Sequence, residues 1–152
     1  MSPNRTHHYI DIENLAGCGR LTAEGAARVR TDWDLAVVAG ERDLFTIGCD
    51  AANVLEAGRV FPGARIVCGH GPDGADLALI QAMDADMAAG PGSSRVILGS
   101  GDHIFALPLA KLARRGVQTR VVGIRGHTSA RLRIAAHHTT LLTETTDEWI
   151  AA

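Results

Sequence analysis

The sequence predicts an α/β fold in which helices cover both faces of a mostly parallel β-sheet. Short, continuous apolar runs of the kind found in strands buried on both faces alternate with helical patterns along the chain. Glycine or proline ends most of these segments, which separates the elements clearly. The 152 residues contain no internal repeat, low-complexity tract or dividing linker, so we expect one domain over residues 1–152.

The first predicted strand is Tyr9–Ile12, and a turn-rich stretch follows it. A helical pattern begins near Thr22. The continuous apolar run at 35–39, which Gly40 ends, predicts the second strand. A helix is expected over 51–60, where Pro62 and Gly63 follow and stop it.

The second half of the chain continues the alternation of strands and helices. Its predicted strands cover 65–68, 96–99, 119–124 and 139–142, and its predicted helices cover 74–89, 102–115 and 129–136. Right-handed crossovers between parallel strands place the carboxyl ends of all strands at one edge of the sheet. In open α/β sheets, that edge holds the functional site.

Composition excludes several classes of protein. Apolar residues make up 46% and charged residues 21% of the chain, which excludes intrinsic disorder and a coiled coil. No apolar run reaches the length of a membrane span, and no apolar segment precedes the first strand, so we expect a cytoplasmic protein. The net charge of −2 gives no overall basic field. Cys18, Cys49 and Cys68 form no C-x-x-C pair and are expected to be small buried residues.

Acidic residues follow three of the predicted strands. Asp11 ends the first strand, Asp73 and Asp76 open the helix after the third, and Asp102 follows the fourth. All of them therefore map to the carboxyl edge of the sheet, where converging carboxylates repel one another unless a cation lies between them. Oxygen ligands without histidine or cysteine favour Mg²⁺ or Mn²⁺, ions that commonly act on phosphate esters.

Each of these acids also has a purely structural interpretation. Asp73 is suited to cap the helix that follows it, and Asp76 occupies the third position of a capping box. Asp102 is equally suited to cap the next helix. Asp11 caps nothing obvious, and its charge is costly to bury among apolar neighbours without a partner.

Three segments of the chain resemble the signature segments of NYN domains, a family of the PIN-like nuclease superfamily. They are Asp11-Ile12-Glu13-Asn14-Leu15, Gly74-Ala75-Asp76-Leu77-Ala78-Leu79 and Ser100-Gly101-Asp102-His103-Ile104-Phe105. Residues 129–142 resemble the closing segment of the family. The resemblance covers nearly the whole chain, and it is specific because the three segments occur in order on successive β–α units.

The resemblance implies a Rossmann-like α/β/α sandwich with strand order 3-2-1-4-5. It also implies metal-dependent cleavage of RNA by Asp11, Asp76 and Asp102, with Asn14 holding Asp11 or the scissile phosphate. The third family segment usually reads Ser-Gly-Asp-x-Asp-Phe, but this chain has Ile104 at the second acidic position. Either one ion suffices, or another acid replaces the missing one, or the domain no longer cleaves; Glu13 and Asp73 are the candidate replacements.

Other polar residues are predicted to support this site. Ser100 is expected to assist Asn14 in holding the acids, or to contact RNA. Arg42 after the second strand, and Arg125 and His127 after the fifth, are expected at the same edge, either bound to RNA phosphates or solvated. The glycine-rich stretch at 69–74 lacks the lysine of a P-loop and the spacing of a dinucleotide fingerprint, so no nucleotide cofactor is expected.

The sequence leaves three functional hypotheses. The first is an Mg²⁺- or Mn²⁺-dependent ribonuclease acting on single-stranded RNA. The second is a non-catalytic RNA-binding or assembly module with a degraded metal site, which Ile104 favours. The third is a phosphatase acting on small esters, although Asp11-Ile12-Glu13 only approaches the D-x-D arrangement expected there. Partners in a membrane are not expected, and homo-oligomerisation is left open.

Overall fold

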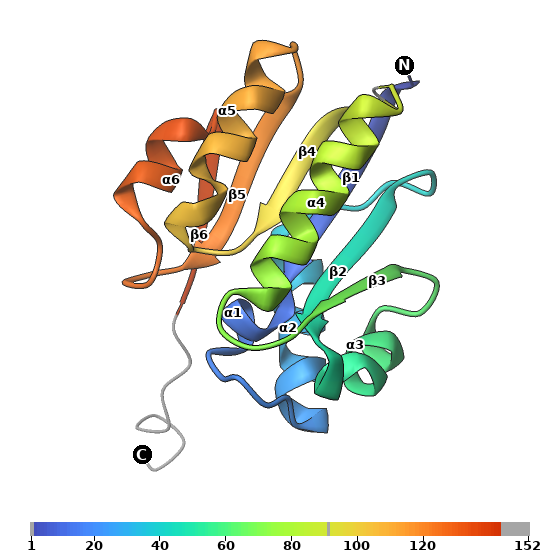
Figure 1. Cartoon of the computed structure of the whole chain (residues 1–152), viewed down its shortest axis with the longest axis vertical. Helices are drawn as coiled ribbons and strands as arrows, with labels where there is room; N and C mark the ends of the chain where they lie inside the picture. The colour runs from blue at the N-terminus through green and yellow to red at the C-terminus, as the bar shows by residue number, and fades with distance from the viewer. Residues whose placement is uncertain (1, 91, 144–152) are drawn as a thin grey trace.

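The fold is built on a six-stranded sheet in which all neighbouring strands run parallel, in the order β3-β2-β1-β4-β5-β6 (Figure 1). The computed structural model of the chain describes residues 2–90 and 92–143. This arrangement confirms the predicted parallel α/β fold and the strand order 3-2-1-4-5, to which β6 is added beside β5.

Each of the strands β1 to β5 is followed by helical structure, as the alternating pattern predicts. The strands are β1 (Ser2–Asp11), β2 (Leu44–Asp50), β3 (Arg65–Gly69), β4 (Ser93–Gly99), β5 (Gln118–Ile124) and β6 (His138–Leu142). The helices are α1 (Ile12–Ala16), α2 (Ala23–Ala36), α3 (Val54–Val60), α4 (Gly74–Ala88), α5 (Ala106–Arg114) and α6 (Ala130–Ala135). Two 3₁₀ turns, η1 (Ala51–Asn53) and η2 (His103–Phe105), precede α3 and α5.

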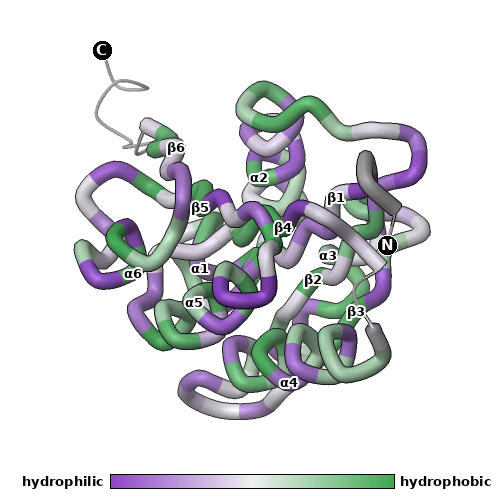
Figure 2. The backbone as a smooth tube through the Cα atoms, turned by 90° about the horizontal axis from the view of Figure 1, so that it is seen from above, coloured by the Kyte–Doolittle hydropathy of each residue, from purple (hydrophilic) through white to green (hydrophobic). Residues whose placement is uncertain are grey.

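The helices form two layers, one on each face of the sheet. Figure 1 shows α4, α5 and α6 in front of the strands, and the view from above in Figure 2 shows α2 on the side opposite to α4 and α5. Neighbouring residues of β1 point to different layers: Ile10 packs with Trp33 of α2, whereas Tyr9 packs with Leu79 of α4. Because both faces are covered, apolar side chains can point in both directions along each strand.

The prediction of a second strand at 35–39 is wrong. The helix α2 continues to Ala36, and Leu35 and Val38 are 83% and 98% exposed. The buried positions in this region, Trp33 and Val37, are four residues apart, which is helical spacing. The true second strand, β2, contains threonine, glycine and cysteine and is therefore less apolar than the run at 35–39.

Gly48 explains why β2 contains small residues. A side chain at this position would collide with Leu79 of α4, so the close approach of that helix requires a glycine in the strand. Because α4 packs closely over β2, this strand needs a small residue at its centre. The same small residue lowers the hydrophobicity of the strand, which is why the sequence pattern did not reveal it. This approach also brings the start of α4 close to the carboxyl edge of the sheet, where its acidic residues lie.

The other predicted elements are observed with shifts at their ends, the largest at β1, which begins at Ser2 rather than Tyr9. The expectation for the cysteines holds for Cys49 alone, because Cys18 and Cys68 are exposed. Burial raises the pKa of Cys49 to about 12, which keeps this thiol protonated. Within residues 2–90 and 92–143, every helix is too short or too polar to cross a membrane.

Candidate active site

The acidic residues singled out in the sequence meet at the carboxyl edge of the sheet. Asp11 is the last residue of β1, and Asp102 follows β4, which pairs directly with β1. Asp73 and Asp76 lie at the start of α4, which packs across β3, β2 and β1. Since β1 lies between β2 and β4, the two strands and the helix converge on one point.

Three of the carboxylates form a compact cluster. Asp73, Asp76 and Asp102 each place one carboxylate oxygen so that these atoms lie within 4.8 Å of one another. Asp11 lies deeper, at 4% exposure, and its carboxyl group forms a hydrogen bond with that of Asp76. Asp73 therefore joins the predicted set of Asp11, Asp76 and Asp102.

The electrostatics of the cluster show the cost of bringing these charges together. Burial, reinforced by the hydrogen bond and charge of Asp11 and by the charge of Asp102, raises the pKa of Asp76 to about 9. Burial also raises the pKa of Asp11 above its ordinary value. A proton is therefore retained between these groups at neutral pH, and a divalent cation would relieve the same repulsion.

Asn14 and Ser100 hold the acids in place through short-range hydrogen bonds. The backbone N–H of Asn14 donates to Oδ1 of Asp11 at 3.3 Å, and Oδ1 of Asn14 accepts from the N–H of Gly101 at 3.0 Å. Ser100 is completely buried, and its Oγ accepts from the N–H of Asp102 at 3.2 Å. Its position fits the predicted support of the acids, because a fully buried hydroxyl has no surface to offer RNA.

The capping roles differ from the sequence prediction. Asp11, which was expected to cap nothing, is the N-cap of α1. Asp102 caps η2 by accepting from the N–H of Ile104 at 3.0 Å, as one interpretation predicts. Asp73 stands at the N-cap position of α4 but makes no capping hydrogen bond through its side chain, so its predicted capping is wrong.

Asp73 also adopts an unusual backbone conformation. Its φ angle of 60° is the only positive φ of a non-glycine residue within residues 2–90 and 92–143. This left-handed conformation costs about 1 kcal/mol or more and persists where the surroundings require it. Here it leaves the carboxylate of Asp73 beside those of Asp76 and Asp102.

The two candidate replacements for the acid missing at Ile104 lie in different surroundings. Oε2 of Glu13 accepts from the backbone N–H of Asp50 and from Nδ2 of Asn53, both at 2.6 Å, so it is engaged in holding the chain after β2. Asp73 has no such engagement and belongs to the cluster. Ile104 itself is half-buried and packs against the core between the sheet and the layer of α4, α5 and α6.

An open cavity of about 620 Å³ lies over these acids. Its lining includes Asp11, Asp73 and Asp76 together with Arg28 and His127. Arg28 is not distinguishable in the sequence, because nothing in the pattern of α2 separates it from other arginines. Its Nη2 donates to the carbonyl of Ala16 at 2.8 Å, which holds the guanidinium at the cavity wall.

The predicted basic residues are divided between the two edges of the sheet. Arg125 and His127 follow β5 and lie at the acidic edge, as expected. Arg42 precedes β2, so the prediction that it lies at this edge is wrong. That prediction assumed a second strand at 35–39, which would end before Arg42, whereas the true second strand begins after it. His103, beside Asp102, is exposed.

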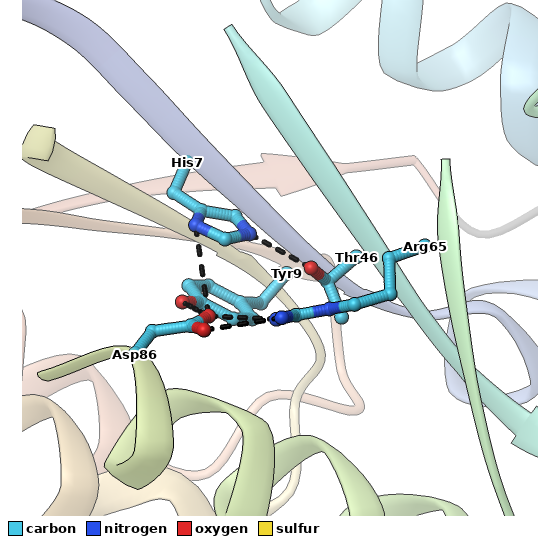
Figure 3. A network of polar contacts seen from close by, with 5 residues as sticks. All are labelled: His7, Tyr9, Thr46, Arg65 and Asp86. Atoms are coloured by element: carbon cyan, nitrogen blue, oxygen red, sulfur yellow. Dashed lines mark hydrogen bonds and ion pairs between the residues drawn. The ribbon is translucent and has the colours of Figure 1, made fainter. Parts of the chain in front are cut away.

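A second polar network lies beneath the far half of α4 (Figure 3). Oη of Tyr9 donates to Oδ2 of Asp86 at 2.5 Å, and Arg65 donates to both oxygens of the same carboxylate. A ring nitrogen of His7 lies 2.8 Å from Oγ1 of Thr46. The network ties α4 to β1, β2 and β3, and so fixes the helix whose other end carries Asp73 and Asp76.

The chain is a parallel α/β domain with a cluster of acidic side chains at the carboxyl edge of its sheet. The NYN domain family model matches residues 53–143, and the chain belongs to this family. A crystal structure of a protein of unknown function from Vibrio parahaemolyticus shares the fold, with a TM-score of 0.63 and 18% sequence identity over 97% of this chain and 98% of that chain. No curated protein matches the sequence.

Proposed function

We propose that the protein is a metal-dependent ribonuclease that hydrolyses phosphodiester bonds of single-stranded RNA in the cytoplasm. The observation that carries the proposal is the cluster of Asp73, Asp76 and Asp102, whose carboxylate oxygens lie within 4.8 Å of one another. Asp73 and Asp76 also line an open cavity. The acids come from segments spread between residues 11 and 102, so the proposed activity belongs to one domain over residues 1–152.

The residues present fit a hard divalent cation. All the donors are carboxylate oxygens, which suit Mg²⁺ and Mn²⁺. The raised pKa of Asp76 is a second indication, because a group that retains a proton through crowding with other acids is one that a cation would stabilise in its charged form. We assign Asp76, Asp102 and Asp73 as the groups that hold the ion, and Asp11 as the deeper acid that completes the negative site.

When bound, the ion would orient water and neutralise charge on the phosphate. The chain itself supplies the geometry. Asn14 joins α1 to the loop after β4, and Ser100 orients the backbone of Asp102. Asp76, which lies between Asp11 and Asp102, is suited either to bind the ion or to accept a proton from the attacking water.

A cleavage assay on end-labelled single-stranded RNA with Mn²⁺ tests the proposal. Asp102→Asn is expected to abolish cleavage while preserving the fold, because asparagine is itself a good N-cap. Asp11→Asn is expected to reduce cleavage in the same assay. Asp50→Asn is the matched control, since Asp50 also caps a 3₁₀ turn directly after a strand but lies outside the cluster.

Full cleavage by the Asp102→Asn variant would contradict the assignment of Asp102. A non-catalytic RNA-binding module is the second candidate function, and Ile104 in place of the family's second acid favours it. In that case, wild-type protein would bind RNA but leave it intact at every Mn²⁺ concentration. The same assay, read by binding and by cleavage, separates the two functions.

A further inference from the structure

The charges of the chain are divided unevenly along the sequence. Residues 103–143 contain no aspartate or glutamate, whereas residues 5–102 contain 14 acidic residues and eight arginines. The basic residues of the acid-free segment are Lys111, Arg114, Arg115, Arg120, Arg125, Arg131 and Arg133. The overall charge of −2 therefore conceals a strongly basic segment.

This segment forms one side of the molecule. It contains α5, β5, α6 and β6, which lie together at one end of the sheet, coloured from orange to red in Figure 1. The acidic cluster lies at its border. The N–H of Ser129 donates to the carbonyl of Gly101 at 2.9 Å, and a side chain at position 101 would collide with the carbonyl of His127. The loop from β5 to α6 is thus packed against the residue that precedes Asp102.

Three arginines extend from this loop onto the adjacent helix. Arg125 lies directly after β5, and Arg131 and Arg133 lie on α6, which packs against η2 behind Asp102. All three are exposed, and none forms an ion pair with another residue in the part of the chain that the structure describes. Their charges are therefore available to phosphates beside the acidic site.

The wall of the cavity that α1 and α2 contribute has a different character. It includes the carboxylates of Glu13 and Asp32, and the one arginine there, Arg28, donates to a backbone carbonyl. A polyanion bound at the acidic cluster would be repelled on that side. Arg125, Arg131 and Arg133, by contrast, belong to the segment of residues 103–143, which contains no acidic residue.

We propose that the RNA strand extends from the acidic site across the β5–α6 loop and α6, with its phosphates bound by Arg125, Arg131 and Arg133. The inference rests on the proposed function and adds the direction in which the substrate lies. Arginine suits this role because its guanidinium binds phosphate oxygens through two parallel hydrogen bonds. The contacts involve only the RNA backbone, so we expect binding along this path to be independent of sequence.

The test measures the affinity of a fluorescein-labelled 12-nucleotide RNA by fluorescence anisotropy in EDTA, which separates binding from cleavage. The variant R131A/R133A is compared with R114A/R115A. Both variants lose two positive charges from exposed positions of the same acid-free segment. They differ in location, because α5 runs from the acidic edge toward the opposite edge, where Arg114 and Arg115 precede β5.

Release of counterions predicts that each lost phosphate contact weakens single-stranded binding about fivefold at 0.1 M salt. We therefore expect the Kd of R131A/R133A to rise about 25-fold, and the slope of log Kd against log salt to fall by about 1.4. The R125A variant is expected to lose about fivefold. R114A/R115A should remain within about twofold of wild type, and melting curves should show that both double variants fold.

Equal weakening by the two double variants would overturn the inference, since it would indicate a diffuse field without a path over α6. Unchanged binding by R131A/R133A, while wild-type protein cleaves RNA, would overturn the inference and leave the proposed function standing. Wild-type protein that neither binds nor cleaves RNA would overturn both.

Discussion

The backbone N–H of Gly101 donates to Oδ1 of Asn14 at 3.0 Å, and this bond joins α1, which follows β1 directly, to the loop after β4. The two residues are 87 positions apart in the sequence. Asp11 precedes Asn14 by three residues and Asp102 follows Gly101 directly, so the bond fixes α1 against the loop that carries Asp102. Asn14 therefore acts as a positioning residue for the acidic cluster.

Substitution Asn14→Ala should weaken Mn²⁺ binding because the loop that carries Asp102 loses this hydrogen bond to α1. We expect affinity to fall by about tenfold, in the range found when residues that orient metal ligands are removed. The free energy of unfolding should fall by about 1 kcal/mol for the lost hydrogen bond. Isothermal titration with Mn²⁺ and denaturant unfolding measure the two effects.

Thr22→Ala is the control for Asn14→Ala. Its Oγ1 accepts from the N–H of Gly25 at 2.9 Å and caps α2, so its loss costs about 1 kcal/mol as well. Because Thr22 contacts none of the clustered acids, Mn²⁺ affinity should be retained. Equal loss of Mn²⁺ affinity in both variants would contradict a specific role for Asn14.

Asp76→Asn should stabilise the metal-free protein, and increasingly so as pH rises. The pKa of Asp76 is about 9 in the folded protein and 3.8 when unperturbed, so the unfolded chain binds fewer protons than the folded one between these values. Stability attributable to this group is complete below pH 3.8 and is lost as pH rises toward 9. Asparagine does not titrate and removes this loss.

Urea unfolding in EDTA at pH 5, 6, 7 and 8 measures this effect. The advantage of Asp76→Asn over wild type should grow across the series, while the variant loses Mn²⁺ binding. Asp84→Asn, on the same helix but outside the cluster, is the matched control for the loss of one carboxylate. A difference that stays constant for Asp76→Asn would contradict the crowding of Asp76 with Asp11 and Asp102.

Ile104→Asp is expected to tighten Mn²⁺ binding. Residue 104 lies two positions after Asp102 and is half-exposed, so a short acidic side chain there adds negative charge near the cluster. A contribution of about 1.4 kcal/mol corresponds to a tenfold gain in affinity. Some stability should be lost, because Ile104 packs against the core.

Titration calorimetry and melting curves test this substitution against Leu55→Asp. The control makes the same change of charge at a position on α3 that is 74% exposed. Unchanged Mn²⁺ affinity together with a large fall in melting temperature would show that residue 104 belongs only to the core.

The network around His7 predicts a loss of stability in mild acid. Burial lowers the pKa of His7 to about 4 in the folded protein, whereas the ordinary value is 6.5. The folded protein therefore binds fewer protons than the unfolded chain in this interval. Stability is complete above pH 6.5 and falls as pH decreases toward 4. The contribution amounts to at most about 3 kcal/mol.

Unfolding of wild type and His7→Gln between pH 4 and 7 measures this contribution. Glutamine keeps a polar group near Thr46 but does not titrate, so the variant should lose less stability in acid than wild type. The other buried histidine of β1, His8, is present in both proteins and cancels in the comparison. Parallel pH profiles for the two proteins would contradict the prediction.

Much of the fold was predictable because local signals agree with the tertiary structure. The breaks at Pro62 and Gly116 follow α3 and α5 closely, and the apolar residues of β4 and β5 are buried on both faces. The error at 35–39 has a physical origin. Hydrophobicity identifies burial only on average, and this run is the exposed end of a helix, whereas β2 is buried through small residues that fit under α4.

The site was predictable to the extent that it depends on strand ends. Asp11, Asp76 and Asp102 follow or approach strand ends in the sequence, and the parallel sheet brings them to one edge. The inclusion of Asp73 was not predictable, since it depends on a left-handed backbone at the start of α4. Arg28 was equally hidden, because its place at the cavity wall depends on how α2 packs against α1.

The sequence by itself determined the alternation of strands and helices, the parallel sheet and the edge at which the acids lie. These features follow from local patterns and from the handedness of crossovers. Only the tertiary structure decided which carboxylates meet, that Asp73 joins them, and that the loop before α6 packs against Gly101. Such features depend on distances between atoms remote in sequence, because electrostatic interaction and hydrogen bonding act through space rather than along the chain.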